Sequence, residues 1–218
     1  MTSLFVTGTD TEVGKTRISV ALMALLAKSG HRIAGMKPVA SGCELTSKGL
    51  RNDDALQLKR QATVPLPYDL MNPYAFEPAI APHIAAEKIG VEINLDLIKQ
   101  HYDQIAQQAD CIVVEGAGGW FVPLGQQTTL ADLAVMLKLP VVLVVSIRLG
   151  CINHALLTVE AIKQSGLPLY GWVANHVGVC TESVEIIATL NKMIASPCLG
   201  TVPVLSPREA VTTLRLLS

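Results

Sequence analysis

The chain has 218 residues, half of them apolar, and its 17 Lys and Arg are balanced by 18 Asp and Glu. A net charge of −1 without a basic stripe or tail argues against nucleic acid as a partner. The five cysteines never form a C-x-x-C pair, which favours reduced thiols over disulfides or a zinc site.

The longest apolar run, residues 18–27, is too short to cross a bilayer about 30 Å thick as a helix. In the first six residues no basic segment precedes the apolar one, so they do not have the pattern of a signal peptide. We therefore expect a cytoplasmic protein without a membrane partner.

Short apolar runs alternate with helical patterns along the chain. The expected strands are residues 4–6, 32–39, 111–114, 141–145, 169–174 and 199–202. The expected helices are residues 15–29, 52–60, 95–108, 130–137, 155–164 and 183–193. Residues 63–83 hold five prolines and are predicted to form an irregular surface excursion. This order predicts one α/β domain over residues 1–218, with a doubly wound, mainly parallel sheet flanked by helices.

The segment Gly8-Thr9-Asp10-Thr11-Glu12-Val13-Gly14-Lys15-Thr16 follows the first strand and opens the first helix. Such a loop wraps phosphates with backbone N–H groups, and the free amides of the helix N-terminus face the same charge. Lys15 would reach the β- and γ-phosphates, and the Thr16 hydroxyl would ligate Mg²⁺. Five residues separate Gly8 from Gly14 instead of the usual four. The segment predicts a nucleotide-binding P-loop, and the alternative is a glycine-containing turn with a chance Gly-Lys-Thr.

Five segments in order resemble the dethiobiotin synthetase family and together cover most of the chain. They are residues 7–16, 37–42, 114–119, 149–154, and 171–175 followed by 200–203. The longer loop spacing is part of the resemblance. Positions 8–13 lack the second lysine that ATPases of the partitioning and nitrogenase iron-protein type carry there.

The resemblance implies a P-loop NTPase fold and a ligase of biotin biosynthesis. Its substrates would be 7,8-diaminopelargonic acid, CO₂ and ATP, and its products dethiobiotin, ADP and phosphate. The reaction would pass through a carbamate and a carbamic–phosphoric anhydride. The resemblance also implies Mg²⁺ as cofactor and a homodimer.

Lys37 and Lys15 are the catalytic residues that the resemblance implies. Lys37 stands at the carboxyl end of a strand, where open α/β sheets bind ligands. It would stabilise the carbamate and the transferring phosphoryl group, with Lys15 as its partner. On the residues alone, a solvated lysine at a strand end is the alternative. Ser41 would hydrogen-bond the nitrogen or carbamate end of the substrate, or it is a turn serine before Gly42.

The expected Mg²⁺ ligands are Thr16, Asp54 and Glu115, because hard cations take hydroxyl, carboxylate and phosphate oxygens. Glu115 follows a buried strand, where a carboxylate without a partner is costly. Asn52-Asp53-Asp54 also has the pattern of a helix cap, and the resemblance selects Asp54 from it.

The resemblance places Asn175 at the edge of the adenine. It places the far carboxylate of the substrate at a dimer interface, where the backbone amides at the start of the helix after Gly150 would bind it. The alternative for these residues is a helix start without a ligand. The expected nucleotide contacts are Thr11, Glu12, Val13, Gly14, Lys15, Thr16, Arg17, Asp54, Glu115, Gly116, Ala117, Gly118, Asn175, His176, Pro203, Val204, Leu205 and Glu209. The expected substrate contacts are Ser41, Gly150, Cys151 and Asn153.

Two other functions fit a P-loop. A different ATP-dependent ligase or amidase, such as a cobyrinic acid amidase relative, usually carries a glutaminase domain, for which 218 residues leave no room. An ATPase switch would need a second lysine in the loop or a membrane-targeting helix, and the sequence has neither.

Overall fold

The computed structural model describes residues 3–204, 211 and 213–216. Its centre is a six-stranded sheet in the order β10-β9-β8-β1-β7-β2, and every pair in it is parallel. The strands are β1 Leu4–Gly8, β2 Ile33–Met36, β7 Cys111–Gly119, β8 Val141–Ser146, β9 Leu169–Asn175 and β10 Cys198–Val202. The expected doubly wound, parallel α/β fold is confirmed.

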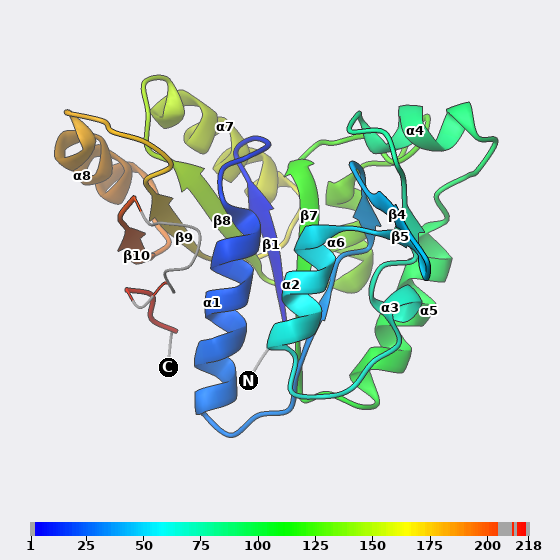
Figure 1. Cartoon of the computed structure of the whole chain (residues 1–218). Coiled ribbons are helices and arrows are strands. Elements are labelled where there is room, and N and C mark those ends of the chain that lie inside the picture. Colours follow the sequence, from blue (N-terminus) through cyan, green and yellow to red (C-terminus); the bar gives the residue numbers. More distant parts are fainter. Residues whose placement is uncertain (1–2, 205–210, 212, 217–218) are drawn as a thin grey trace.

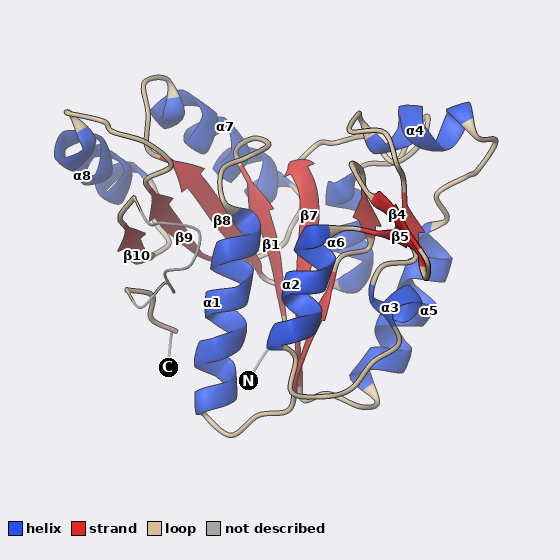
Figure 2. Cartoon of the chain, in the orientation of Figure 1, coloured by secondary structure: helices blue, strands red, loops and turns tan. Residues whose placement is uncertain are grey.

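Helices cover both faces of this sheet, with α1 and α2 in front and α6 and α7 behind (Figure 2). The main helices are α1 Lys15–Lys28, α2 Asp53–Gln61, α5 Leu95–Ala106, α6 Leu130–Leu137, α7 Cys151–Gln164 and α8 Ser183–Met193. Because both faces are covered, β1 and β8 are buried along their whole length. This explains the continuous apolar runs in the sequence.

Local capping fixes several helix starts. Asn52 and Asn94 each accept a backbone N–H with their side chains, at the starts of α2 and α5. Thr129 and Asp132 form a capping box at α6. The helix expected at residues 155–164 begins four residues earlier, at Cys151, because Gly150 adopts a left-handed conformation and ends the preceding loop.

The strand expected over residues 32–39 is divided. β2 ends at Met36, and β3 Val39–Ala40 leaves the main sheet to pair with β6 Tyr74–Ala75. Pro38 stands between the two strands and has no N–H for a ladder. Lys37 lies at this break, directly after β2.

The prediction of a surface excursion over residues 63–83 is wrong in one respect. The segment contains only the short elements α3 Tyr68–Met71 and β6 before α4 Pro82–Lys88 begins, but it is not superficial. Leu66, Met71 and Phe76 are buried in the main core. The prolines indicate irregular backbone correctly and carry no information about burial.

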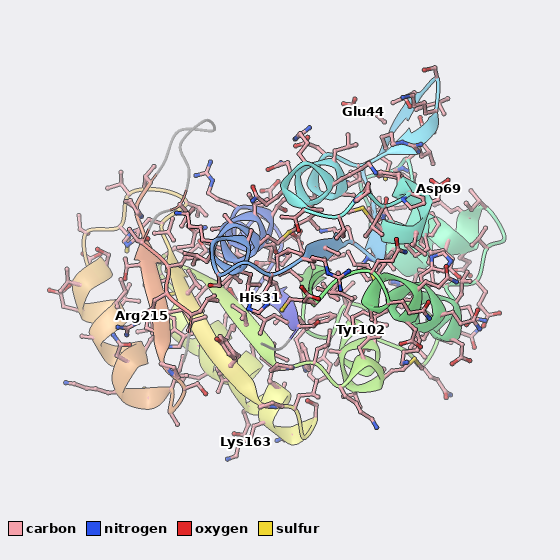
Figure 3. All side chains as sticks on the ribbon, turned by 90° about the horizontal axis from the view of Figure 1, so that it is seen from below. His31, Glu44, Asp69, Tyr102, Lys163 and Arg215 are labelled. Atoms are coloured by element: carbon pink, nitrogen blue, oxygen red, sulfur yellow. The ribbon has the colours of Figure 1, made fainter. Side chains whose placement is uncertain are left out.

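An antiparallel hairpin, β4 Glu44–Thr46 and β5 Gly49–Arg51, was not expected from the sequence. Figure 3 shows it, with Glu44 labelled, projecting from the body of the molecule. All five cysteines are free thiols, and Cys198 is half-buried. None of the helices in the described part of the chain is long and apolar enough to cross a membrane.

Candidate nucleotide and substrate site

The loop between β1 and α1 lies at the carboxyl edge of the sheet, to which β1, β7 and β8 all point (Figure 1). Glu12 and Gly14 have positive φ angles of 58° and 90°. A side chain on Gly8 would meet Val13 Cγ2 at 2.5 Å, so the closure of the loop requires glycine there. Lys15 Nζ donates to the carbonyl oxygen of Asp10 at 2.9 Å. The loop is therefore tightly folded around its own lysine.

The Lys15 ammonium is buried, with an exposed fraction of 7% for the residue. Burial, and then the nearby Lys37 ammonium, lower the pKa of Lys15 to about 8. The Lys15 and Lys37 ammonium groups repel each other, so an anion bound between them would stabilise both. This is the electrostatic property that a phosphate site needs.

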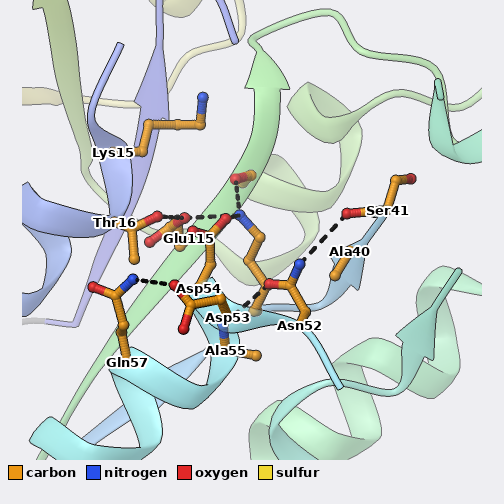
Figure 4. Close-up of polar contacts among 12 residues, drawn as sticks. Lys15, Thr16, Ala40, Ser41, Asn52, Asp53, Asp54, Ala55, Gln57 and Glu115 are labelled. Carbon is orange, nitrogen blue, oxygen red and sulfur yellow. Dashed lines mark hydrogen bonds and ion pairs between the residues drawn. The ribbon is translucent and has the colours of Figure 1, made fainter. Parts of the chain in front are cut away.

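Lys37 is held by three acceptors, two of which, the Asp54 and Glu115 carboxylates, are labelled in Figure 4. Its ammonium donates to Glu115 Oε1 at 2.7 Å, to Asp54 Oδ2 at 3.1 Å and to the Gly116 carbonyl at 3.1 Å. Burial works against the charged form, but the carboxylates of Glu115 and Asp54 outweigh it and raise the pKa of Lys37. The solvated lysine considered above is thus a buried, fully charged group.

Glu115 is completely buried, and its two oxygens are used unequally. Oε1 accepts from Lys37 and also from Thr16 Oγ1, at 2.8 Å. Oε2 is buried without a partner among the described residues. An unpartnered carboxylate oxygen in such a place is costly, and a cation would remove that cost. This observation fits the Mg²⁺ that the sequence suggests.

Asp54 and Thr16 complete the expected ligand set. Burial disfavours the Asp54 carboxylate, but the Lys37 ammonium and the Thr16 hydroxyl outweigh it and lower the pKa of Asp54. No group of three or more His, Cys, Asp or Glu side chains that could hold a metal occurs within the described ranges. A cation here would therefore depend on phosphate oxygens and water in addition to these side chains, as Mg²⁺ sites commonly do.

These groups line a cavity of about 740 Å³. Besides Lys15, Thr16, Lys37, Asp54 and Glu115, its walls include Thr11, Glu12, Gly14, Ser41, Ala117 and Gly118. The Ser41 hydroxyl is buried without a partner among the described residues. Ile80, Pro82 and Val122 form an apolar wall. The cavity thus joins a charged end to an apolar side.

A second cavity of about 600 Å³ adjoins the first, because Gly14 and Thr16 line both. Its walls include Arg17, Asn175, His176 and Val204. Pro203 lines a smaller neighbouring cavity with His176 and Val204. Leu205 and Glu209 lie outside the described residues.

Two expected nucleotide contacts are placed differently from the rest. The Val13 side chain is buried in the core, so only its backbone faces the site. The Gly116 carbonyl accepts from Lys37, and Gly116 lines neither cavity.

The residues at the start of α7 are also separate from both cavities. Gly150 and Asn153 are exposed, and Cys151 is buried in the core. Arg148, just before them, forms an ion pair with Asp10 of the loop at 3.1 Å. The helix start is therefore next to the loop but open to the surface.

Sequence reasoning did not identify three buried polar residues as parts of the site: Asn52 in the wall of the first cavity, and Tyr68 and Asn72, which are hydrogen-bonded to one another beside it. Asn52 was recognised only as a cap, and Tyr68 and Asn72 lie in the segment interpreted as superficial. Their signal is weak in a sequence, because buried asparagine and tyrosine are recognised only by their partners.

A parallel sheet with a phosphate-type loop after its first strand defines a P-loop nucleotide-binding protein. The family model of an AAA domain matches residues 2–212. Two solved structures share the fold at low sequence identity. The MinC:MinD cell division complex of Aquifex aeolicus is 17% identical with a TM-score of 0.60, covering 95% of this chain and 83% of that one. MinD of Pyrococcus horikoshii, with Mg-ADP, is 14% identical with a TM-score of 0.57, covering 94% and 82%.

Within this class, the chain belongs to the ATP-dependent dethiobiotin synthetase family. It is 54% identical over 205 residues to ATP-dependent dethiobiotin synthetase BioD of Pseudomonas aeruginosa, covering 93% of this chain and 90% of the relative. The relative of the same name from Cellvibrio japonicus is 52% identical, with 95% and 92% covered. That of Yersinia pestis is 50% identical, with 97% and 89% covered.

Proposed function

We propose that the protein closes the ureido ring of dethiobiotin from 7,8-diaminopelargonic acid, CO₂ and ATP, with release of ADP and phosphate, in biotin biosynthesis. Identity of 50–54% to dethiobiotin synthetases over nearly the whole chain supports this. The structural observation that carries it is one cavity that joins Lys15, Lys37 and Glu115 to the Ser41 hydroxyl, which has no partner among the described residues.

The chemistry needs charge neutralisation more than covalent catalysis. One substrate amine attacks CO₂ and loses a proton, giving a carbamate. A carbamate oxygen attacks the γ-phosphorus of ATP, and ADP leaves. The second amine then attacks the carbamoyl carbon of the anhydride, loses a proton and closes the ring as phosphate departs with the bridging oxygen. Negative charge gathers on the phosphoryl oxygens and the carbamate, and the Lys15 and Lys37 ammonium groups of the cavity wall would stabilise it.

Thr16, Asp54 and Glu115 are the residues that would hold Mg²⁺. When bound, the cation neutralises charge on the β- and γ-phosphates. Ser41 would hydrogen-bond the carbamate or its nitrogen with its hydroxyl. Thr11, Glu12, Ala117 and Gly118 would enclose the phosphates, and Ile80, Pro82 and Val122 would contact the aliphatic part of the diamine.

The adenine would occupy the second cavity. Asn175 is 4% exposed and donates its amide Nδ2 to the Val13 carbonyl at 2.7 Å, which leaves its carbonyl oxygen as the group for the adenine edge. His176 and Val204 would pack beside the base, with Pro203 at the rim. Both cavities meet at Gly14, so a single nucleotide could reach from one into the other.

The far carboxylate of the substrate would bind at the start of α7, at a site completed by a second copy of the chain. The helix amides that follow Gly150 favour an anion. The exposed fractions of Leu149, Phe121 and Leu157 are 94%, 63% and 63%, which gives this side of the molecule an apolar surface suited to a homodimer. The proposal includes a cytoplasmic location, where ATP and bicarbonate are at hand.

The test is a turnover assay with ATP, bicarbonate and the diamine, in which dethiobiotin is identified by mass spectrometry and ADP is counted. We expect one ADP per dethiobiotin and no turnover when any component is left out. ATP hydrolysis that is unaffected by the diamine would instead identify an ATPase switch.

A further inference from the structure

A chain of buried hydrogen bonds connects Asn52, which lines the first cavity, to Tyr68 and Asn72, which do not line it. The Tyr68 hydroxyl donates to Asn72 Oδ1 at 2.9 Å and accepts from the Asn52 backbone N–H at 2.8 Å. The exposed fractions of Asn52, Tyr68 and Asn72 are 7%, 8% and 3%. Buried polar groups are costly unless they are paired, so a chain whose members satisfy one another is rigid.

One end of this chain holds the backbone of Lys37. Asn72 Nδ2 donates to the Lys37 carbonyl at 2.6 Å and to the Tyr74 carbonyl at 3.3 Å. The Lys37 N–H donates to the Met71 carbonyl at 2.9 Å. Both backbone polar groups of Lys37 are therefore bound by the α3 segment, at the point where Pro38 stops the ladder of the main sheet.

The other end holds two more parts of the cavity. Asn52 Nδ2 donates to the Ser41 carbonyl at 3.4 Å. Asn52 Oδ1 accepts from the Ala55 N–H at 3.2 Å and so fixes the first turn of α2, which carries Asp54. Lys37 and Ser41 lie on either side of β3 and Asp54 lies in α2, and this chain of hydrogen bonds connects their backbones.

We propose that Tyr68 and Asn72 are positioning residues of the reaction. They hold the backbone of Lys37 at a fixed distance from Ser41 and from the start of α2, so that the ammonium and the serine hydroxyl face the same substrate atoms. The inference rests on the proposed function, because Lys37 and Ser41 matter only if the carbamate lies between them. Small displacements of a catalytic group cost rate without removing any contact to the nucleotide.

Tyr68→Phe is the sharpest test, because it removes only the hydroxyl. The ring stays under Arg51, whose guanidinium carbon lies 4.2 Å from the ring centroid. We expect kcat to fall about tenfold, the order that a displaced catalytic group can produce. The Kd for ATP, measured by calorimetry, should stay within about twofold because none of the three residues bonds to the phosphate loop. Asn72→Asp keeps the shape but loses the donor to Lys37, and should lower kcat at least as much.

The matched control is a variant that lowers the stability of the protein at a position outside the Asn52–Tyr68–Asn72 hydrogen-bond chain. Ile162→Val truncates a fully buried side chain of α7 and is compared at an equal loss of Tm. The inference is overturned if Tyr68→Phe keeps full kcat, if Ile162→Val loses as much kcat at equal Tm, or if ATP affinity falls in parallel with kcat. Failure of the unsubstituted protein to make dethiobiotin would instead refute the proposed function.

Discussion

The Lys37 ammonium nitrogen lies 2.7 Å from Glu115 Oε1, and the same oxygen accepts the Thr16 hydroxyl at 2.8 Å. One buried carboxylate oxygen therefore serves both the expected catalytic lysine and an expected metal ligand. A divalent cation bound at Glu115 and Asp54 would compete with Lys37 for these carboxylates, and repulsion between the cations would direct the ammonium toward the cavity.

The first prediction follows from this competition. Lys37→Met removes the positive charge between Asp54 and Glu115, so the protein without nucleotide should bind Mg²⁺ or Mn²⁺ more tightly, by about tenfold or more. Free Mn²⁺ measured by electron paramagnetic resonance reports this directly. Lys48→Met, on the exposed hairpin, makes the same change in net charge and should leave the affinity unchanged. Equal affinities in the three proteins would contradict competition.

The second prediction concerns turnover. Lys37→Gln keeps much of the length and loses the charge, so kcat should fall by about 10²–10³ while ATP affinity changes little. Lys37→Arg should recover little, because a planar guanidinium does not replace a compact ammonium at a crowded site. Product formation and calorimetry on the same protein separate the two effects. Near-normal turnover would remove Lys37 from the mechanism, and loss of ATP binding alone would make it a binding residue.

The third prediction is that Asn175 acts on the phosphates as well as the base. Its Nδ2 bonds to the Val13 carbonyl, and a side chain on Gly14 would meet that nitrogen at 2.2 Å. Asn175→Leu should therefore lower the affinity for inorganic tripolyphosphate several-fold, about the contribution of one hydrogen bond. The affinity for ATP should fall as well.

The control for Asn175 is an apolar residue of the same cavity, whose side chain cannot form a hydrogen bond to the loop. Val204→Ala should lower the affinity for ATP and leave the affinity for tripolyphosphate unchanged. Calorimetric titrations with both ligands give the comparison. Unchanged tripolyphosphate binding in Asn175→Leu would restrict Asn175 to the base.

The fourth prediction is a pH dependence of nucleotide binding. The pKa of Lys15 is about 8 without nucleotide, and phosphate charge beside the ammonium raises it. At a pH above the Lys15 pKa of the nucleotide-free protein, ATP binding is therefore accompanied by uptake of a proton. The ATP affinity should be constant below this pKa and fall as the pH rises through it. Calorimetry in buffers of different ionisation enthalpy measures the uptake. Lys15→Gln should abolish it, and unchanged uptake in that variant would assign the proton to another group.

The sequence was informative where one local pattern decides the structure. Residues 141–146 are apolar throughout except Ser146, and a short valine-rich run of this kind is typical of a strand covered on both faces. The loop from Gly8 to Thr16 has a spacing that specifies its own conformation. The bonds of Lys37 could not be predicted, because Glu115 lies 78 residues away and the two meet only in the folded protein.

The segment 63–83 shows a second limit. Proline interrupts the regular hydrogen-bond ladders of strands, but it gives no information about whether a segment is buried. The burial of Tyr68 and Asn72 was therefore not predicted. Their burial depends on β3 pairing with β6, a contact of two residues per strand that no periodicity reveals.

The central position of β1 has a consequence for how the molecule is made. Phe5 pairs with Val114 on one side and with Val141 on the other, so β1 has no strand partner until more than half of the chain has been synthesised. Parallel pairings between such distant residues form slowly. The phosphate loop thus leaves the ribosome early as part of an apolar segment with two open edges, and a growing chain in this state is exposed to aggregation until β7 and β8 arrive.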